Sequence, residues 1–472
     1  MQKNGLDSLA NQSVWLEVLG NLWRLALPVL AEEILNLLVG YTDWWLAGHF
    51  LKTADHQAAM GLVAYLTWLL PSLFATLVIG STAMVSRFVG ARQPDDALRV
   101  VNQAILLGSL LALALVFVSV LGGSTFVAAM QLESKAAELA VIYLWIIIPG
   151  IPFMMIEQVG SACLRGAGDT YSGFLARVVV NIVNAIVSPV LLLGIGPFPE
   201  MGWAGLAIGT LCGHVIGGGI ILWWLCRGRS GLRLQRALFT PDRDLIRRLL
   251  RIGLPGGIDV LALIGCHLTY LSIINRLGTL AAAAHGLGIQ IEALSYLPGT
   301  AFAVAATTIA GQSLGAGNAQ RAVRGVGLTC AITVTFMSCA AFVLFQFGTE
   351  LATFFTGDAT SPVSQLTGRL LRIAALASPF LGLLQCTVGG LRGAGDTRLP
   401  LIITFVGLIG IRLPLACLLA WDHVTLPILG IVIPGMGWGV IGAWWAMAGD
   451  VFVRSMIATG RFIQGGWKRV TV

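Results

Sequence analysis

Three carboxylates, Glu32, Glu33 and Asp43, interrupt a long apolar run near residues 24–48. On a helix that advances about 100° per residue, Glu32 and Asp43 are about 20° apart, and Asn36 lies between them on the same stripe. Glu33 falls roughly 80° from Asp43, away from that stripe. A charge at the centre of a bilayer costs about 2.5–3.5 kcal/mol on insertion scales, so acids in such a run are candidate functional groups. The chemistry open to them is the binding and release of a proton or a cation.

A second polar group lies in the apolar run near 172–195. Asn181 and Asn184 are three residues apart on one helix face, and Ser188 follows one turn later. Their amide and hydroxyl groups could complete a site with a carboxylate from the first run. We therefore predict a proton- or sodium-binding site in the first half of the chain, with Asp43 as its principal residue. The candidate residues are Asp43, Glu32, Glu33, Asn36, Asn181, Asn184 and Ser188.

The second half of the chain has its own polar residues within apolar runs, among them Asp259, Gln290 and Glu292. Two interpretations are open for the acids. They bind a cationic substrate or a second ion, or they form polar contacts between helices. The candidate substrate-binding residues are Asp259, Tyr270, Gln290 and Glu292.

The remaining reactive residue types form no catalytic or metal-binding pattern. The eight cysteines are scattered singly through apolar runs, and the six histidines form no HExxH or comparable cluster. Asp450 and Arg454 have the i, i+4 spacing of a structural ion pair. We predict no enzymatic activity, no cofactor, and no metal other than the sodium ion considered at Asp43.

The elements that carry these residues are predicted to be transmembrane helices. The chain is 57% hydrophobic and 11% charged, with a mean hydropathy of +0.85, which is too apolar for a soluble domain of this length. A segment that satisfies its own backbone in lipid is a helix, and the runs lack the alternation of barrel strands. The fold class is therefore an all-α membrane protein with 12 transmembrane helices. The predicted spans lie near 24–48, 59–86, 100–122, 138–163, 172–195, 202–226, 250–275, 281–313, 323–346, 368–390, 400–421 and 432–458.

An internal repeat groups these helices. The heptapeptide Leu-Arg-Gly-Ala-Gly-Asp-Thr occurs at 164–170 and again at 391–397. A repeat of this length indicates a duplicated lobe rather than a solenoid of short units. We predict two six-helix lobes, 1–226 and 250–472, joined by a cytoplasmic loop at 227–249. The heptapeptide itself is interpreted as a turn, with its glycines ending one helix and its Asp-Thr capping the next.

The basic residues indicate membrane topology rather than a nucleic-acid partner. The net charge is +7, and eight arginines lie between Arg227 and Arg251, while the connections predicted on the other side are mostly acidic. This is the positive-inside bias, and it places both termini in the cytoplasm. We predict a multi-pass protein of a bacterial inner membrane that contacts the lipid bilayer, binds no nucleic acid and works as a monomer.

These motifs together resemble the multidrug and toxic compound extrusion (MATE) family over nearly the whole chain. The residues that carry the resemblance are the paired heptapeptides, Leu27-Pro28 followed by Asp43 and Gly48, Gly311-Gln312 with Gly315-Ala316-Gly317-Asn318, Arg412-x-Pro414, Asp450, Arg454 and Trp467. The resemblance implies two six-helix bundles that face each other across a central cleft. It also implies antiport, in which substrate leaves as sodium ions or protons enter, and it assigns the cation or proton site to Asp43.

The chain departs from the family pattern in one place. The family often has an acid four residues after the asparagine that matches Asn184, and this chain has Ser188 there. We hypothesise that Glu32 or Glu33 takes over the role of the missing carboxylate. The lobes also differ, because Glu32 has Asp259 at its repeat-equivalent position, whereas Asp43 has Tyr270.

The resulting functional prediction is a secondary active exporter. It would move small organic cations or other amphipathic drugs and metabolites out of the cell, driven by H⁺ or Na⁺ entry through the acidic site of the first lobe. Duplicated lobes suit alternating access. The alternative is an exporter or flippase of a lipid-linked or anionic metabolite within the same superfamily.

Overall fold

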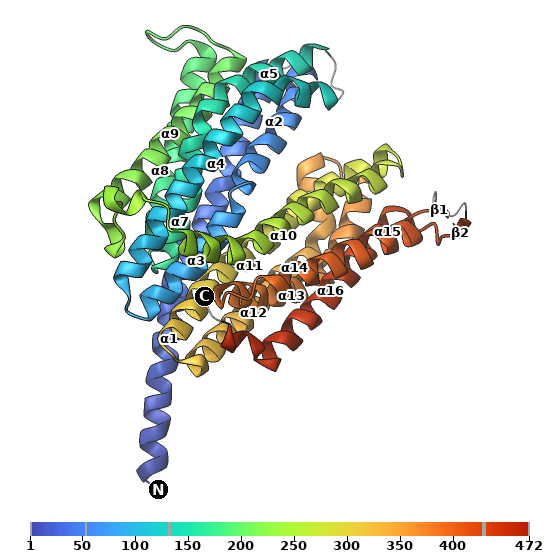
Figure 1. Cartoon of the computed structure of the whole chain (residues 1–472). Coiled ribbons are helices and arrows are strands. Elements are labelled where there is room, and N and C mark those ends of the chain that lie inside the picture. The colour runs from blue at the N-terminus through green and yellow to red at the C-terminus, as the bar shows by residue number, and fades with distance from the viewer. Residues whose placement is uncertain (1, 52–53, 131–133, 427–430, 471–472) are drawn as a thin grey trace. The chain divides into compact units, whose positions relative to one another are not determined.

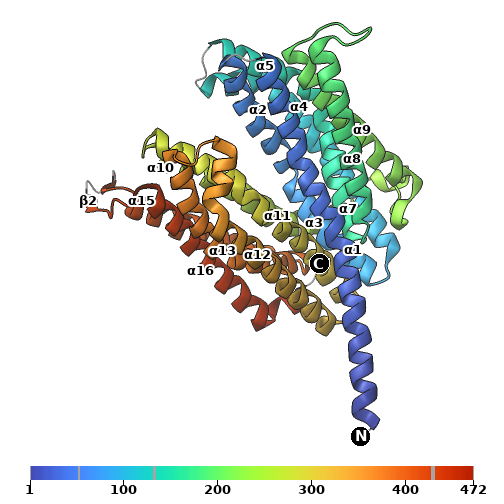
Figure 2. The ribbon, with the colours of Figure 1, turned by 180° about the vertical axis from the view of Figure 1, so that it is seen from behind.

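The computed structural model describes residues 2–51, 54–130, 134–426 and 431–470. The chain forms two units, which we call the N-terminal unit (Arg24–Gly257) and the C-terminal unit (Ile258–Val472 together with Met1–Trp23). Figure 1 shows both as bundles of long helices, and Figure 2 shows them from behind.

The predicted helical spans agree with the helices of the structure. Among the described residues, ten helices are long and apolar enough to cross a membrane, or eleven if the bent pair Thr279–Ala293 and Ser295–Gly315 counts as one span. These correspond to every predicted span except that near 24–48. That segment lies in helix α1 (Gln2–Leu46), whose apolar sequence is interrupted by the three carboxylates.

The elements of the N-terminal unit follow one another along the chain. After α1 they are the π-helical turn η1 (Ala47–Leu51), α2 (Ala54–Ser72), α3 (Ala75–Gly90), α4 (Pro94–Ala129), α5 (Ser134–Ile147), η2 (Ile148–Gly150), α6 (Ile151–Met155), η3 (Ile156–Gly160), α7 (Ser161–Gly166), α8 (Thr170–Leu193), α9 (Trp203–Arg227), η4 (Arg229–Gly231) and η5 (Arg236–Phe239).

The second set of helices forms the C-terminal unit, except that the first of them begins in the N-terminal unit and continues into the C-terminal unit at Ile258. They are α10 (Arg243–Asn275), α11 (Thr279–Gly315), α12 (Ala319–Thr356), α13 (Pro362–Gly393), α14 (Arg398–Thr404), η6 (Phe405–Arg412), α15 (Leu413–Ala420), α16 (Gly439–Gln464) and η7 (Gly466–Arg469). Strands β1 (His423–Leu426) and β2 (Ile431–Pro434) pair antiparallel, with His423 opposite Pro434. The last span was predicted from residue 432, but α16 begins at Gly439 because β2 occupies the first part of that run.

Local sequence explains where several helices begin and end. Pro94 starts α4, and Asp95 and Asp96 follow in its first turn. A backbone N–H at the first helical position has no partner within the helix, so proline loses no hydrogen bond there. The two carboxylates complement the positive end of the helix dipole. Asp169 caps α8 by accepting a hydrogen bond from the Ser172 backbone. Gly194, with φ +67°, ends the same helix in the left-handed conformation that favours glycine.

The polar segment after α9 is held against α4 by two buried amide side chains. Asn102 Nδ2 donates to the carbonyl of Arg233 at 3.0 Å, and its Oδ1 accepts from the backbone N–H of Gln235 at 2.9 Å. Gln103 Nε2 donates to the carbonyls of Leu238 and Thr240, each at 2.8 Å. The predicted inter-lobe loop therefore packs on the N-terminal unit.

Candidate functional site

Asp43 lies buried in the N-terminal unit, with 5% of its surface exposed, among polar side chains from three other helices. Thr210 Oγ1 donates to Asp43 Oδ2 at 2.8 Å, and Asn184 Nδ2 donates to Oδ1 at 3.2 Å. Tyr143 OH lies 3.5 Å from Oδ2. Ser188 Oγ is 3.1 Å from Asn184 Nδ2. We call these five residues the Asp43 cluster.

The polar contacts within the Asp43 cluster are nearly complete. The Nδ2 of Asn184 also lies 3.1 Å from Thr210 Oγ1, and Tyr143 OH lies 3.2 Å from the same hydroxyl. One buried polar atom of the cluster, Asn184 Oδ1, has no hydrogen-bond partner among the described residues. The carboxylate is thus held by hydrogen-bond donors, and an acceptor lies beside it.

Glycines on α9 position the cluster. Gly205, Gly209, Gly213 and Gly217 recur every four residues, so they line one face of the helix. A Cβ built at Gly205 would lie 2.6 Å from the Leu191 backbone, and one at Gly209 would lie 2.7 Å from the Ser188 nitrogen. Helices α8 and α9 therefore meet almost backbone to backbone, and both views show them side by side (Figures 1 and 2). Thr210 follows Gly209 directly, and this close approach brings its hydroxyl to Asn184.

The predicted residues Asn184 and Ser188 join Asp43, but the others do not. Glu32 shares the buried face of α1 with Asp43, yet it lies 11 residues away, about 16 Å along the helix axis. Asn36 is exposed and donates to Glu33 Oε2 at 3.3 Å, so it does not bridge Glu32 and Asp43. Asn181 donates to the carbonyl of Arg177 at 2.9 Å.

Sequence reasoning missed Tyr143 and Thr210. A single hydroxyl in an apolar helix hydrogen-bonds to its own backbone so often that it carries little signal. Thr210 does this too, at 3.2 Å from the Leu206 carbonyl. The available signal was its place beside the glycine-lined face, which marks the side of α9 that packs on α8.

The two heptapeptides hold matching ion pairs, which we call the repeat clamps. Arg165 Nη1 lies 3.0 Å from Glu32 Oε1 in the N-terminal unit, and Arg392 pairs with Asp259 in the C-terminal unit. Both pairs join the end of the fourth span of a lobe to its first span. The turn interpretation is thus incomplete, because the arginine of each repeat pairs with an acid of another helix.

The aspartate of each heptapeptide contacts a further arginine, near the end of the last helix of its lobe. Asp169 Oδ2 accepts from Arg229 Nε at 3.0 Å and from Ser230 Oγ at 2.7 Å, just after α9. Asp396 Oδ2 lies 3.0 Å from Arg461 Nη2 near the end of α16. Partial burial opposes ionisation of Asp169, but hydrogen bonds from Ser230, Ser172 and Arg229 outweigh it and lower the pKa of this carboxyl.

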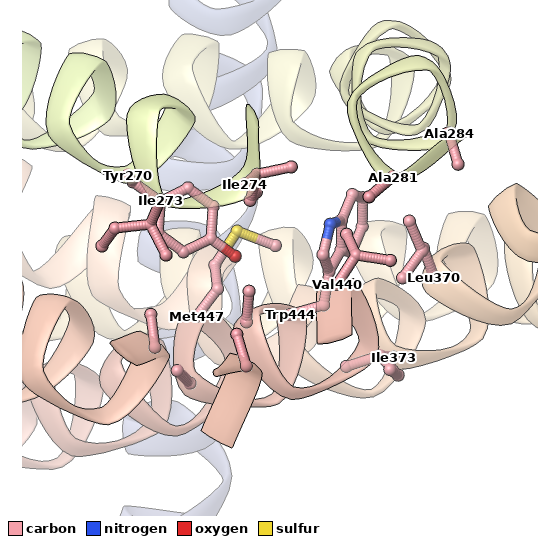
Figure 3. Close-up of a cluster of buried hydrophobic side chains, with 14 of the residues drawn as sticks. Tyr270, Ile273, Ile274, Ala281, Ala284, Leu370, Ile373, Val440, Trp444 and Met447 are labelled. Carbon is pink, nitrogen blue, oxygen red and sulfur yellow. The ribbon is translucent and has the colours of Figure 1, made fainter. Parts of the chain in front are cut away.

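Tyr270, at the repeat position of Asp43, lies in a hydrophobic cluster of the C-terminal unit. Figure 3 shows it among Ile273, Ile274 and Met447, and it is 2% exposed. Its hydroxyl is buried without a hydrogen-bond partner among the described residues. The guanidinium of Arg412 lies 5.9 Å from the ring centroid. The C-terminal unit therefore has no carboxylate where the N-terminal unit has Asp43.

The four candidate substrate-binding residues do not form one group. Asp259 is taken up by its repeat clamp, and Tyr270 is buried in the core. Gln290 is exposed and Glu292 is half-buried, both on α11. Glu292 interacts electrostatically with Tyr270 and with Arg412. Of the four candidate residues, only Glu292 and Tyr270 are linked by such an interaction.

The predicted pair of Asp450 and Arg454 is confirmed, and it has a third member. Arg454 Nη2 lies 2.7 Å from Asp450 Oδ2, and Arg412 Nη2 lies 2.9 Å from the same oxygen. Asp450 is fully buried, and both arginines are nearly so. No group of three or more metal-binding side chains occurs among the described residues.

Comparisons with known proteins cover almost all of the chain. The family model described as MatE matches twice, at residues 28–190 and 255–418, once in each copy of the repeat. The probable multidrug resistance protein NorM of Thermotoga maritima is 27% identical over 456 residues, which cover 97% of this chain and 94% of that protein. The multidrug resistance protein MdtK of Pectobacterium atrosepticum is 25% identical over 419 residues, 86% of this chain and 88% of that protein.

Solved structures share the fold. The crystal structure of MATE in complex with MaL6 has a TM-score of 0.85 at 21% identity, covering 95% of this chain and 97% of that one. The outward-facing conformation of a multidrug resistance MATE family transporter of the MOP superfamily has a TM-score of 0.85 at 20% identity, covering 96% of both chains.

Proposed function

This chain belongs to the MATE family of membrane transporters, which are not enzymes, and from this premise we propose that it is a secondary active exporter that exchanges small molecules for protons. Relatives named as multidrug resistance proteins support a substrate range of organic cations and other amphipathic compounds. The exporter needs no cofactor, lies in a bacterial inner membrane with both termini in the cytoplasm, and acts as a monomer.

The Asp43 cluster is the observation that carries the proposal. The ionised carboxylate accepts hydrogen bonds from Thr210 and Asn184. A protonated carboxyl donates one hydrogen bond and accepts fewer, so these donors lose their partner. Proton binding at Asp43 thereby changes which packing of α1 against α8 and α9 is favoured. A ligand shifts the equilibrium between two conformations only if it binds one of them more tightly than the other. We propose that the proton does so, because the two packings of α1 differ in the hydrogen bonds they offer to the Asp43 carboxyl.

The energy available is sufficient for export. One charge that crosses a potential of 100 mV releases about 2.3 kcal/mol, and a pH difference of one unit adds about 1.4 kcal/mol. A tenfold outward gradient of substrate requires about 1.4 kcal/mol per molecule. One proton therefore drives export of an uncharged substrate, whereas a monovalent cation carries the same charge outward, so for it the pH difference alone balances a tenfold gradient.

Sodium is the second candidate for the coupling ion, and one observation favours it. The buried Asn184 Oδ1 is an unpartnered oxygen close to the Asp43 carboxylate, and carboxylate, amide and hydroxyl oxygens are ligands of hard cations. We favour the proton because the other partners of Asp43 are arranged as hydrogen-bond donors. We also keep as a proposal that Glu32 or Glu33 serves the coupling site, and wild-type coupling in Glu32→Gln and Glu33→Gln would exclude it.

The substrate alternative is a lipid-linked or anionic metabolite. Buried arginines in the spans, such as Arg412 and Arg454, are its best support, but both are already paired with Asp450. We therefore keep cationic and amphipathic molecules as the proposed substrates, with Glu292 as the substrate-facing acid of the C-terminal lobe. The two lobes, 1–226 and 250–472, act as the moving parts around the 227–249 loop.

The test is transport of ethidium, a fluorescent organic cation, in proteoliposomes. A pH gradient and a sodium gradient are imposed separately, with Asp43→Asn as the control protein. We expect the pH gradient to drive ethidium movement and Asp43→Asn to abolish it. Transport driven only by sodium would replace the proton with sodium, and no transport under either gradient would defeat the exporter proposal.

A further inference from the structure

A second buried polar group lies in the N-terminal unit and contains its only histidine within a described membrane span. Glu157 on η3, Arg177 on α8 and His214 on α9 meet inside the helix bundle, with 4%, 8% and 12% of their side chains exposed. Arg177 Nη2 lies 3.0 Å from Glu157 Oε1, and His214 Nδ1 lies 2.9 Å from Glu157 Oε2. We call these residues the Glu157 triad. Residue Glu157 lies on a π-helical turn, a local irregularity that often marks a functional position.

The same two helices carry the triad and the Asp43 cluster. On α9, His214 follows Thr210 by four residues, so the imidazole lies about one turn, or 6 Å, along the helix from the hydroxyl that binds Asp43. On α8, Asn181 lies between Arg177 of the triad and Asn184 of the cluster, at i+4 and i+3 spacings. His214 interacts electrostatically with Asp43 across this gap. The two polar groups are thus neighbours in one helix bundle.

The charges of the triad leave one exchangeable proton. Arg177 stays protonated, because a guanidinium does not release its proton in proteins. Arg177 and His214 each contact one oxygen of the Glu157 carboxylate, so a proton on the imidazole would lie beside an opposite charge. With neutral imidazole the triad has no net charge, and with imidazolium it has one positive charge next to Asp43. In the tautomer whose Nδ1–H donates to Glu157, the other ring nitrogen, Nε2, is the one that can take up a proton.

A buried carboxylate of the C-terminal unit, Asp450, shows which partners a purely structural carboxylate has. Asp450 is fully buried like Glu157, but both of its partners are arginines, Arg412 and Arg454. Neither of them can give up a proton. Glu157 has one arginine partner, Arg177, and its second partner is the histidine His214. That partner is the side chain whose ordinary range of protonation includes neutral pH.

We propose that His214 is the second proton site of the exporter and receives the proton that Asp43 releases. The O–H bond of the Asp43 carboxyl breaks, an N–H bond forms at Nε2 of His214, and the imidazolium is held by Glu157. That N–H bond then breaks and the proton passes to water toward the cytoplasm. This inference rests on the proton exchange proposed above and adds its inward route.

The groups that face this route are consistent with inward movement. Near His214 they are Asp43 on α1, Glu157 on η3 and Arg177 on α8. Tyr143 on α5 faces Asp43. Arg177 interacts electrostatically with Glu33, which lies one residue from the Glu32 of the repeat clamp. On α1 these acids lie ten and 11 residues before Asp43, toward the predicted cytoplasmic end. Acids and bases thus continue from Asp43 past His214 toward that end.

Two transport modes of the same proteoliposomes separate a proton role from a structural one. Exchange of internal for external ethidium keeps the transporter deprotonated, so it needs no proton release. Net ethidium transport driven by a pH gradient needs release in every cycle. We expect His214→Gln to keep the exchange rate of the wild type and to lower the pH-driven net rate about tenfold or more. His285→Gln is the matched control, because His285 is a buried histidine of the C-terminal unit that hydrogen-bonds Trp444, and we expect it to keep both rates.

The outcomes distinguish this inference from the exporter proposal. If the wild type shows no pH-driven transport, the exporter proposal fails first. If the wild type is driven by the pH gradient and Asp43→Asn is not, but His214→Gln matches the wild type, the inference alone is wrong. Equal loss of exchange and net transport in His214→Gln would assign His214 a structural role and also overturn the inference. Should His214→Gln not fold, the double variant Glu157→Gln with Arg177→Gln removes the stabilising charges without leaving a net charge, and it must show the same selective loss.

Discussion

Asp43 and Tyr270 occupy the same position of the repeat, 227 residues apart, and their surroundings are opposite. Asp43 accepts hydrogen bonds from side chains of α8 and α9. Tyr270 packs among aliphatic side chains, and its hydroxyl has no partner among the described residues. A carboxylate without partners would be costly at such a buried position, whereas a tyrosine ring gains from burial. One copy of the position therefore holds a group that can change charge, and the other holds part of the hydrophobic core.

The repeat clamps, in contrast, are alike in the two units. Glu32 with Arg165 and Asp259 with Arg392 join matching helices in the two units. Where the copies agree, the residues hold the scaffold together. Where they disagree, the residues differ in the chemistry they can perform. Comparison of the two copies thus separates structural from functional candidates in a single sequence.

The largest expected difference between the units follows from replacing the two equivalent residues. Asp43→Asn removes the only carboxyl group of its cluster with little change in shape, so pH-driven ethidium transport should fall to the level of empty liposomes. Tyr270→Phe removes a hydroxyl with no partner, so transport should stay within about twofold of the wild type. Parallel transport assays at matched protein density check both. Equal loss in the two variants would contradict the division of roles.

The repeat clamps should differ in strength. Glu32→Gln leaves Arg165 in a largely buried place without its carboxylate, and breaking such a pair costs about 3–5 kcal/mol of stability. Asp259→Asn should cost less, because Arg392 is 28% exposed and water can solvate it. Unfolding in mixed detergent micelles measures both. The double variant Glu32→Gln with Arg165→Gln is the control and should recover much of the loss.

Glycine substitution tests how the Asp43 cluster is positioned. Gly209→Ala places a methyl group against Ser188 and forces α8 and α9 apart, at a cost of about 1–3 kcal/mol. Gly442→Ala is a matched change in the other unit, where the added Cβ would meet the Leu419 carbonyl at 2.5 Å. Thermal unfolding should shift similarly in both variants. Only Gly209→Ala should also weaken proton coupling, and an equal effect on coupling would argue against positioning by α9.

The smallest expected effect concerns the turn of the first heptapeptide. Asp169 caps α8, and Asp169→Asn keeps an oxygen for this cap but removes the charge that Arg229 contacts, so it should cost about 1 kcal/mol or less at neutral pH. Hydrogen bonds from Ser230, Ser172 and Arg229 lower the pKa of Asp169 in the folded protein. Its stabilising contribution is therefore complete above the unfolded-state pKa and disappears as the pH falls through the folded-state pKa. Thermal unfolding from neutral to acidic pH should show the two proteins converge at the acidic end, and a constant difference would contradict this.

The sequence predicted the helical spans and the duplication well, because hydrophobic length and an internal repeat are direct consequences of the bilayer and of gene duplication. It also predicted that Asp43, Asn184 and Ser188 are polar residues of one region. It missed Tyr143 and Thr210, since a hydroxyl in an apolar helix gives no pattern until the neighbouring helix is known. It grouped Asn36 with Glu32 and Asp43 by helix angle alone, but the exposed Asn36 contacts Glu33 instead. The angular position of a residue around its helix does not show which side chains of the adjacent helices lie next to it.

Proton release on substrate binding tests most directly whether coupling resides in the N-terminal unit. Ethidium is added to detergent-solubilised protein in weakly buffered solution, and a pH indicator reports the protons released. We expect release by the wild type and by Glu292→Gln, and none by Asp43→Asn, with ethidium binding confirmed for all three by fluorescence. Release that survives in Asp43→Asn but disappears in Glu292→Gln would place the coupling group in the C-terminal unit and contradict the assignment of coupling to Asp43.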